Sequence, residues 1–154
     1  MSALAQARAG EWTGWTGLEP VDEAAAVALL GDAAPPRQWA RLSRRQVHTR
    51  IWPSPRTQVW FDGTADTILM VEVRPDPARP SIGEIVAEFG PPPLSGPPRV
   101  LVVGVAREYV YLDRGVAFTL GGDPENVLAA RVFAPADEPT WLLRLGGGDM
   151  PGPG

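Results

Sequence analysis

The chain has 154 residues, of which 44% are hydrophobic, and carries a formal net charge of −4. This length fits one domain with a hydrophobic core, and the acidic balance gives no electrostatic reason to expect nucleic acid. Cysteine is absent, which excludes disulfides, thiolate catalysis and cysteine-based metal sites. All 14 basic residues are arginine, which, with the abundant Ala, Gly and Pro, is typical of a GC-rich bacterial genome.

The segment Met1–Arg8 lacks the basic stretch and apolar run of a signal peptide. Nowhere does the chain approach the roughly 18 consecutive apolar residues that a membrane helix needs. We therefore expect a cytoplasmic protein that has no membrane partner.

Residues 1–20 predict an irregular N-terminal arm. Its Trp12 and Trp15 stand beside glycines. Exposed tryptophan is disfavoured, so we expect the arm to pack on the domain, the alternative being a docking peptide for a partner.

Two short helices are predicted from their end signals. The first, Asp22–Leu30, has acidic residues in its first turn and Gly31 after its last. The second begins near Ser81, with Glu84 at capping-box spacing and an apolar stripe that ends at Phe89. Glycine and prolines terminate both helices.

Strand-like runs follow each helix in a similar order. They are Val47–Trp52, Val59–Phe61 and Ile68–Val73 after the first, and Arg107–Leu112, Val116–Leu120 and Val127–Phe133 after the second. Arg99–Val105 predicts a further strand, Gln38–Ser43 a weaker one, and Thr140–Leu145 an edge strand or short turn. The predicted fold class is α+β: two tandem helix-plus-antiparallel-meander units forming one sheet, with helices on one face.

The domain organisation follows from these elements. Residues 21–145 are predicted to form a single domain of two repeats, 21–75 and 81–135. A stiff proline-rich connector, 75–80, joins them, and 91–98 is a second proline-rich loop. Residues 146–154 are rich in Gly and Pro and are predicted to be a disordered tail.

Strand alternation divides the side chains between a helix-covered face and an open face. Val47, Thr49 and Ile51, together with Val110 and Leu112, are assigned to the core. The open face then carries aromatic and arginine side chains of the kinds enriched at interface hot spots. We expect a protein partner to bind there through Arg50, Trp52, Trp60, Tyr109, Tyr111, Arg131 and Phe133. One alternative is that the N-terminal arm or the segment with Trp141 covers this face. The other is that its aromatic and arginine side chains are exposed at the surface without a binding role.

Ser81–Pro92, closed by Glu88-Phe89-Gly90-Pro91-Pro92, and the aromatic strand and turn of Tyr109–Phe118 resemble known units of this kind. The tandem arrangement resembles the β-lactamase inhibitor protein fold, and one unit is similar to small outer-membrane assembly lipoproteins. The resemblance implies binding through a concave sheet face without catalysis. The chain departs from both families in having no cysteine, and no partner residue is carried over.

Catalytic motifs are absent from the sequence. His48 is the only histidine, which excludes multi-histidine metal sites, and no serine lies in a Gly-x-Ser-x-Gly elbow. We therefore predict a non-enzymatic protein-binding module, such as an adaptor, an inhibitor or immunity-type antagonist, or an assembly subunit, that needs no cofactor. The alternative is a small-ligand-binding domain or enzyme with a pocket between sheet and helices.

An arginine-rich span between Arg37 and Arg56 includes Trp39 and Trp52. Arginine with aromatic side chains can bind single-stranded nucleic acid, but the overall acidity of the chain favours an acidic protein partner instead.

Overall fold

The computed structural model describes residues 2–19, 21–31, 35–42, 45–53, 56–62, 67–74, 79–96, 105–122 and 124–141. They form an α+β fold with one large antiparallel sheet. The helices are α1 (Ala3–Ala9), α2 (Glu23–Leu30), α3 (Ile82–Phe89), the short turn α4 (Glu138–Thr140) and the 3-10 turn η1 (Leu112–Arg114). The strands are β1 (Gln38–Leu42), β2 (Arg45–Pro53), β3 (Arg56–Phe61), β4 (Ile68–Arg74), β5 (Leu94–Gly96), β6 (Val105–Tyr111), β7 (Val116–Gly121) and β8 (Asn126–Val132).

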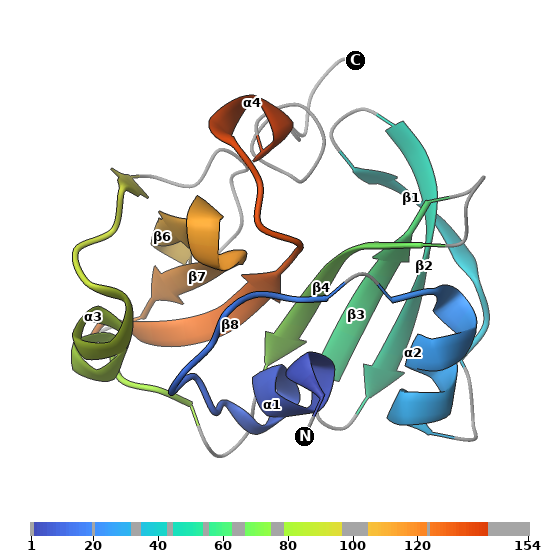
Figure 1. The fold of residues 1–154 in the computed structure, drawn as a ribbon, viewed down its shortest axis with the longest axis horizontal. Coiled ribbons are helices and arrows are strands. Elements are labelled where there is room, and N and C mark those ends of the chain that lie inside the picture. The colour runs from blue at the N-terminus through green and yellow to red at the C-terminus, as the bar shows by residue number, and fades with distance from the viewer. Residues whose placement is uncertain are drawn as a thin grey trace.

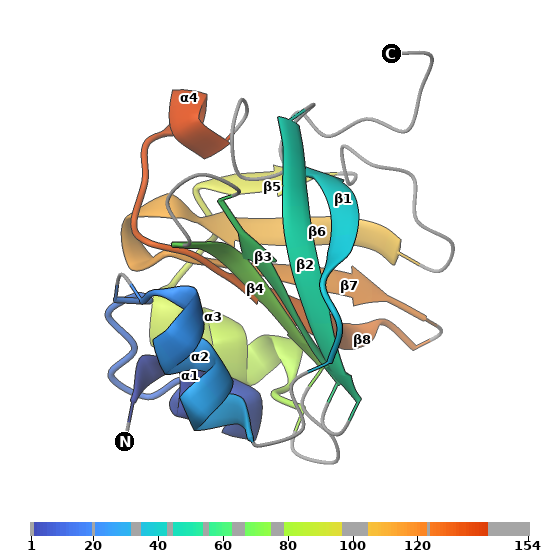
Figure 2. The ribbon, with the colours of Figure 1, turned by 90° about the vertical axis from the view of Figure 1, so that its right-hand side faces the viewer.

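The eight strands are ordered β1-β2-β3-β4-β8-β7-β6-β5, so that β4 and β8 meet in the middle. The sheet is strongly twisted: β2 stands almost upright in Figure 2 where β6 lies across the view. Helices α1, α2 and α3 lie against one face of the sheet, and α4 lies on the other side (Figures 1 and 2). We call these the helix face and the opposite face.

The two predicted helices are confirmed, although Asp22, which was predicted inside the first turn, is the N-cap of α2. The Asp22 carboxylate accepts a hydrogen bond of 2.8 Å from the Ala25 amide at the start of α2. Ser81 and Glu84 form the predicted capping box at the start of α3. The six stronger strand-like runs all fall within or beside observed strands, and the weak Gln38–Ser43 run corresponds to β1.

The N-terminal segment is more regular than the sequence suggested. Residues 3–9 form α1, which Ser2 caps by accepting from the Ala5 amide at 3.2 Å. The prediction of an irregular lead-in is therefore wrong for these residues, since the small alanine-rich turn gains stability by packing. Trp12 and Trp15 are buried among α3 and the sheet, as expected of a packed arm.

Several other predictions concern segments at or beyond the limits of the described chain. Strand β5 lies inside the predicted 91–98 loop and pairs with β6. Most of the predicted Arg99–Val105 strand lies outside the described residues, as do 75–78 of the connector and the tail 146–154. The predicted Thr140–Leu145 element begins as the end of α4, and from 142 onwards it too lies outside.

The main core lies between the sheet and α1–α3. It includes the buried side chains of Trp15, Ile85 and Phe118. The strand registers assign the sheet side chains of this face, because directly opposed residues of antiparallel strands project to the same side. Phe61 opposes His48, Val59 opposes Arg50, and Phe118 opposes Tyr109.

Candidate functional site

The opposite face has two small apolar clusters. Val47, Trp60 and Met70 form one of them, on the β1–β4 half of the sheet. The other contains Val110, Ala117, Phe133 and Trp141, and here α4 covers the β6–β8 half. A row of polar side chains from β3, β4 and β8 crosses the sheet beside these clusters. This row holds the candidate site.

At the centre of the row, the Glu72 carboxylate accepts contacts from three guanidinium groups. Its oxygens lie 3.2 Å from Arg131 Nε, 3.5 Å from an Arg56 nitrogen and 3.6 Å from an Arg74 nitrogen. The registers explain this convergence, because Glu72 opposes Arg131 on β8 and Gln58 on β3, and Arg56 opposes Arg74. We call Arg56, Arg74 and Arg131 the arginine patch.

Among the residues that the structure describes, the charge of the arginine patch is unbalanced. Three guanidinium groups share one carboxylate, and Arg56 also reaches Gln58 Oε1 at 3.5 Å. The Glu72 side chain is only 11% exposed, whereas those of Arg56 and Arg74 are 38% and 48% exposed. A buried carboxylate thus orients guanidinium groups that still have N–H donors available to solvent. A guanidinium group recognises carboxylates or phosphates through paired hydrogen bonds.

Three of the seven predicted binding residues lie on the opposite face. Arg131 is part of the arginine patch. Trp60 opposes Met70 in the apolar cluster of β1–β4 and is 9% exposed. Phe133 is completely buried, and the Trp141 ring packs against it at a tilt of 35°, with ring centroids 4.9 Å apart. The segment with Trp141 therefore covers part of this face, which is one of the alternatives that the sequence left open.

The other four, Arg50, Trp52, Tyr109 and Tyr111, lie on the helix face. Their strand neighbours across β2–β3 and β6–β7 are core residues such as Val59 and Val116. The assignment of these four side chains to the open face is therefore wrong, and so is that of Val47, Thr49, Ile51 and Val110 to the helix side. The structure does not test the predicted role of the four in binding, which stays a prediction.

Polar partners within the helix face explain this reversal. Tyr111 is almost fully buried and donates its hydroxyl to the Gly90 carbonyl at 2.9 Å, and burial raises the pKa of this phenol. Arg107 lies 5.0 Å from the centre of the Tyr109 ring. The buried hydroxyl of Tyr111 is therefore satisfied, which lowers the cost of its burial, whereas the buried Trp52 Nε1 has no hydrogen-bond partner among the described residues.

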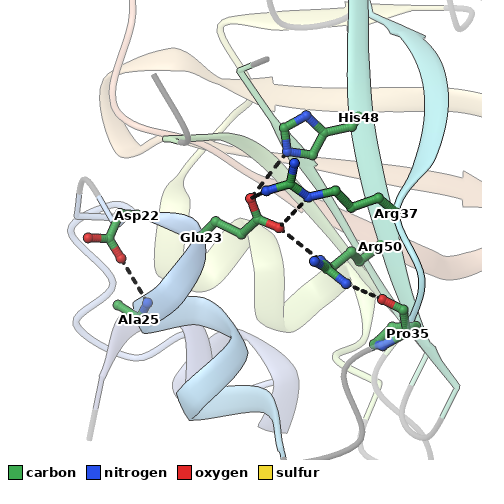
Figure 3. A network of polar contacts seen from close by, with 7 residues as sticks. All are labelled: Asp22, Glu23, Ala25, Pro35, Arg37, His48 and Arg50. Carbon is green, nitrogen blue, oxygen red and sulfur yellow. Dashed lines mark hydrogen bonds and ion pairs between the residues drawn. The ribbon is translucent and has the colours of Figure 1, made fainter. Parts of the chain in front are cut away.

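The polar side chains that β2 places on the helix face have Glu23, the first residue of α2, as their partner (Figure 3). Its carboxylate accepts from Arg37 at 2.7 Å and from Arg50 at 2.9 Å, and lies 3.3 Å from His48 Nε2. Arg50 also donates to the Pro35 carbonyl. Burial alone would raise the pKa of Glu23, but the hydrogen bonds from Arg50, Arg37 and His48 outweigh it, so that the pKa is lowered.

The sequence predicts only a helix-start role for Glu23 and places Arg56 in the arginine-rich span, and the seven predicted binding residues include none of Glu72, Arg56 and Arg74. One signal could have indicated Glu72, which interrupts the apolar run Ile68–Val73 of a central strand. A buried acid in such a strand requires cationic partners. No comparable signal indicates Glu23, since an acidic residue in a first helical turn is common.

A groove of about 590 Å³ lies on the helix side, between α3 and the loop after α1. Glu11, Trp12, Glu84 and Glu88 are among its lining residues. Two of these acids already have structural roles: Glu84 caps α3, and Glu88 accepts from the Gly14 amide and from Arg114. His48 is not among its lining residues.

Within the ranges that the structure describes, no three acidic or histidine side chains are grouped as metal ligands would be. No helix in the same ranges has the length and apolar character needed to span a membrane. Comparison with known protein families, curated proteins and solved structures found no match to this chain.

Proposed function

We propose that this protein is a non-enzymatic protein-binding module whose arginine patch receives an acidic surface of a partner protein. One observation carries the proposal: a nearly buried carboxylate, Glu72, holds three guanidinium groups on the sheet face that α1, α2 and α3 leave uncovered. Partner carboxylates would pair with the outward donors of Arg56 and Arg74. Arg131, the least exposed of the three, would hold Glu72 in place.

The charge distribution supports a protein partner over nucleic acid. The whole chain has a net charge of −4, so a polyanion would meet long-range repulsion outside the patch. A local contact between a few carboxylates and a small cationic patch avoids most of that repulsion, because exposed charges are screened beyond about 10 Å at 0.1 M salt.

The environment of His48 supports a non-enzymatic role. This side chain is 4% exposed, stacks on Phe61 with ring centroids 5.4 Å apart, and contacts the Glu23 carboxylate. A substrate in solvent could not reach it without local unfolding. We therefore assign His48 to the core of the helix face.

We further propose that the sheet consists of two tandem helix-plus-meander units, as the resemblance to the β-lactamase inhibitor protein fold implies. The element order supports this, because α2 precedes β1–β4 and α3 precedes β5–β8. The sheet order is mirrored about the β4–β8 pair, as two such meanders joined by their last strands would produce.

Affinity enrichment with the double variant Arg56→Gln/Arg74→Gln tests the proposal. Glutamine removes both outward charges and leaves Arg131 to pair with Glu72. Enriched proteins from the native source are quantified by mass spectrometry, and each candidate is re-tested as a purified protein. We expect at least one acidic protein whose affinity falls about tenfold in the variant and also falls with added salt.

Arg79→Gln is the control for the loss of one arginine charge. Arg79 is exposed and lies outside the arginine patch, just before α3. This control should bind like the wild type. If every purified partner binds the double variant and the wild type equally well, the arginine patch is not the binding site and the proposal fails.

The alternative function is a small-ligand site, and the groove beside α3 is where we would place it. Its lining acids, Glu11, Glu84 and Glu88, would select a cationic ligand. Calorimetric titration with spermidine separates the two functions. The ligand site is favoured over protein binding if spermidine binds saturably, if Glu11→Gln weakens this binding, and if the Arg56→Gln/Arg74→Gln variant leaves it unchanged.

A further inference from the structure

Strand β1 is an edge of the sheet and carries the most exposed large apolar side chain of the described chain. It pairs with β2 from Gln38↔Thr49 to Leu42↔Arg45, and no other described strand pairs with it. The Trp39 side chain is 74% exposed, compared with 44% for Leu29 and 38% for Val86. An edge strand presents backbone N–H and C=O groups in a row that can pair with another chain.

Two arginines flank this tryptophan. Alternation places Arg37 and Arg41 two positions before and after Trp39, on the same side of the strand. Arg37 contacts the buried Glu23 carboxylate, although its side chain remains 52% exposed, and Arg41 is exposed. The outer part of β1 therefore combines an indole, which is a strong interface anchor, with a guanidinium group on either side.

We infer that β1 binds an extended acidic segment of a partner protein by strand addition. The partner's backbone would pair with the outer edge of β1, while its carboxylates face Arg37 and Arg41 and an apolar side chain covers Trp39. The alternation of one strand suits this arrangement, because every second partner residue projects to the side of Trp39.

Charge favours such a segment over a second copy of this chain. Antiparallel self-pairing centred on Trp39 would place Arg37 directly opposite Arg41 of the second copy, and like charges directly opposed across strands are destabilising. An antiparallel acidic strand instead places opposite charges there. This inference goes beyond the proposed function, since β1 lies two strands from β3 and the arginine patch lies on the opposite face.

The test uses the full chain and two peptides of equal charge that contain no tryptophan. One is Ac-Thr-Glu-Thr-Val-Thr-Glu-Thr-NH2, in which two Glu and the central Val project to one side at the spacing of Arg37, Trp39 and Arg41. In the other the Thr-Val pair at the centre is replaced by Pro-Pro, which cannot donate backbone hydrogen bonds. Amide hydrogen exchange measured by NMR reports on β1. We expect the first peptide to bind saturably and slow the exchange of outward-facing β1 amides, and the second to bind about tenfold more weakly.

Four variants show where on the protein the first peptide binds. Trp39→Ala should weaken the first peptide about tenfold and Arg41→Glu still more, whereas Arg79→Glu, the same charge change on an exposed arginine elsewhere, should have little effect. Arg56→Gln/Arg74→Gln should bind the peptide normally. If instead this double variant loses the peptide and Trp39→Ala retains it, the peptide occupies the arginine patch: the edge inference is overturned and the proposed function is supported.

Three further results would overturn the inference. Equal affinity for both peptides would mean that charge alone, without strand pairing, explains binding. A dimer of the wild type in sedimentation velocity that Trp39→Ala dissociates would assign the edge to a second copy. Oligothymidylate serves as the polyanion control, and tighter binding of this oligonucleotide than of the first peptide would also reject an acidic protein segment.

Discussion

Trp15 and Arg114 lie 99 positions apart and hold each other through two reciprocal hydrogen bonds. The indole Nε1 of Trp15 donates to the Arg114 carbonyl at 2.9 Å, and the Arg114 Nε donates to the Trp15 carbonyl at 2.6 Å. The same guanidinium group packs over the Phe89 ring at 4.6 Å and contacts Glu88 at 3.3 Å. One arginine thus joins the N-terminal segment to α3 and to the turn before β7.

Replacing Trp15 by phenylalanine should lower the free energy of unfolding by about 2 kcal/mol, because it removes a buried hydrogen bond and creates a small cavity. Trp12→Phe is the matched control. Trp12 is also buried, at 5% exposed against 1% for Trp15, but its Nε1 has no hydrogen-bond partner among the described residues. Urea unfolding should show a loss about 1 kcal/mol smaller for Trp12→Phe. Equal losses would mean that the contact with Arg114 adds no stability.

Gly115, which follows η1, should tolerate no side chain. Its φ is +65°, and a Cβ there would lie 2.2 Å from the Phe133 carbonyl oxygen. We expect Gly115→Ala to cost about 3 kcal/mol or more, through the left-handed conformation and the clash together. Gly14→Ala is the control, since its φ is +74° with open space around it, and it should cost about 1 kcal/mol. Similar midpoints for the two variants in urea would contradict the clash.

The contacts of Glu23 with Arg37, Arg50 and His48 should make the free energy of unfolding depend on pH in the acidic range. The pKa of Glu23 is lowered in the folded protein, so its stabilising contribution is complete above the ordinary glutamate pKa of about 4.3. This contribution declines as the pH falls below that value and vanishes below the folded pKa.

Glu23→Gln should therefore lose about 2–3 kcal/mol at pH 7, where Arg37 and Arg50 lose a charged acceptor. The difference between wild type and variant should shrink in urea unfolding below about pH 4. Asp22→Asn is a neighbouring control that removes a charge outside the contact of Glu23 with Arg37, Arg50 and His48. A difference between Glu23→Gln and wild type that stays constant down to the acid transition would mean that the carboxylate is not stabilised by its cations.

Glu72 and Arg131 should be energetically coupled, because their contact bridges the β4 and β8 strands at the middle of the sheet. A double-mutant cycle with Glu72→Gln and Arg131→Gln, measured by urea unfolding, should give a coupling energy of about 1–3 kcal/mol. Coupling below about 0.5 kcal/mol would show that Arg56 and Arg74 replace Arg131 as partners of the carboxylate.

Local signals predicted α2, α3 and most strands well. Ser81 was recognisable as a cap because Glu84 follows it at capping-box spacing and the amide that bonds to its side chain lies only three residues away. The helix formed by residues 3–9 was not predicted, because a short alanine-rich segment has little helical stability by itself. It is held by the burial of Leu4 and Ala7 and by contacts such as Arg8 Nε to Thr57 Oγ1 at 3.1 Å.

What the sequence determined by itself is therefore local: element type, caps, turns and the absence of cysteine chemistry. Which side of β2 and β6 faces the helices was decided only by tertiary structure. In β2, Val47 and Thr49 alternate with His48 and Arg50, and hydrophobicity alone favours burying the first pair against the helices. Glu23 reverses that choice, because a carboxylate from another element satisfies the polar ends of His48 and Arg50. The arginine patch has the same origin, since Arg56, Glu72 and Arg131 meet only through strand register.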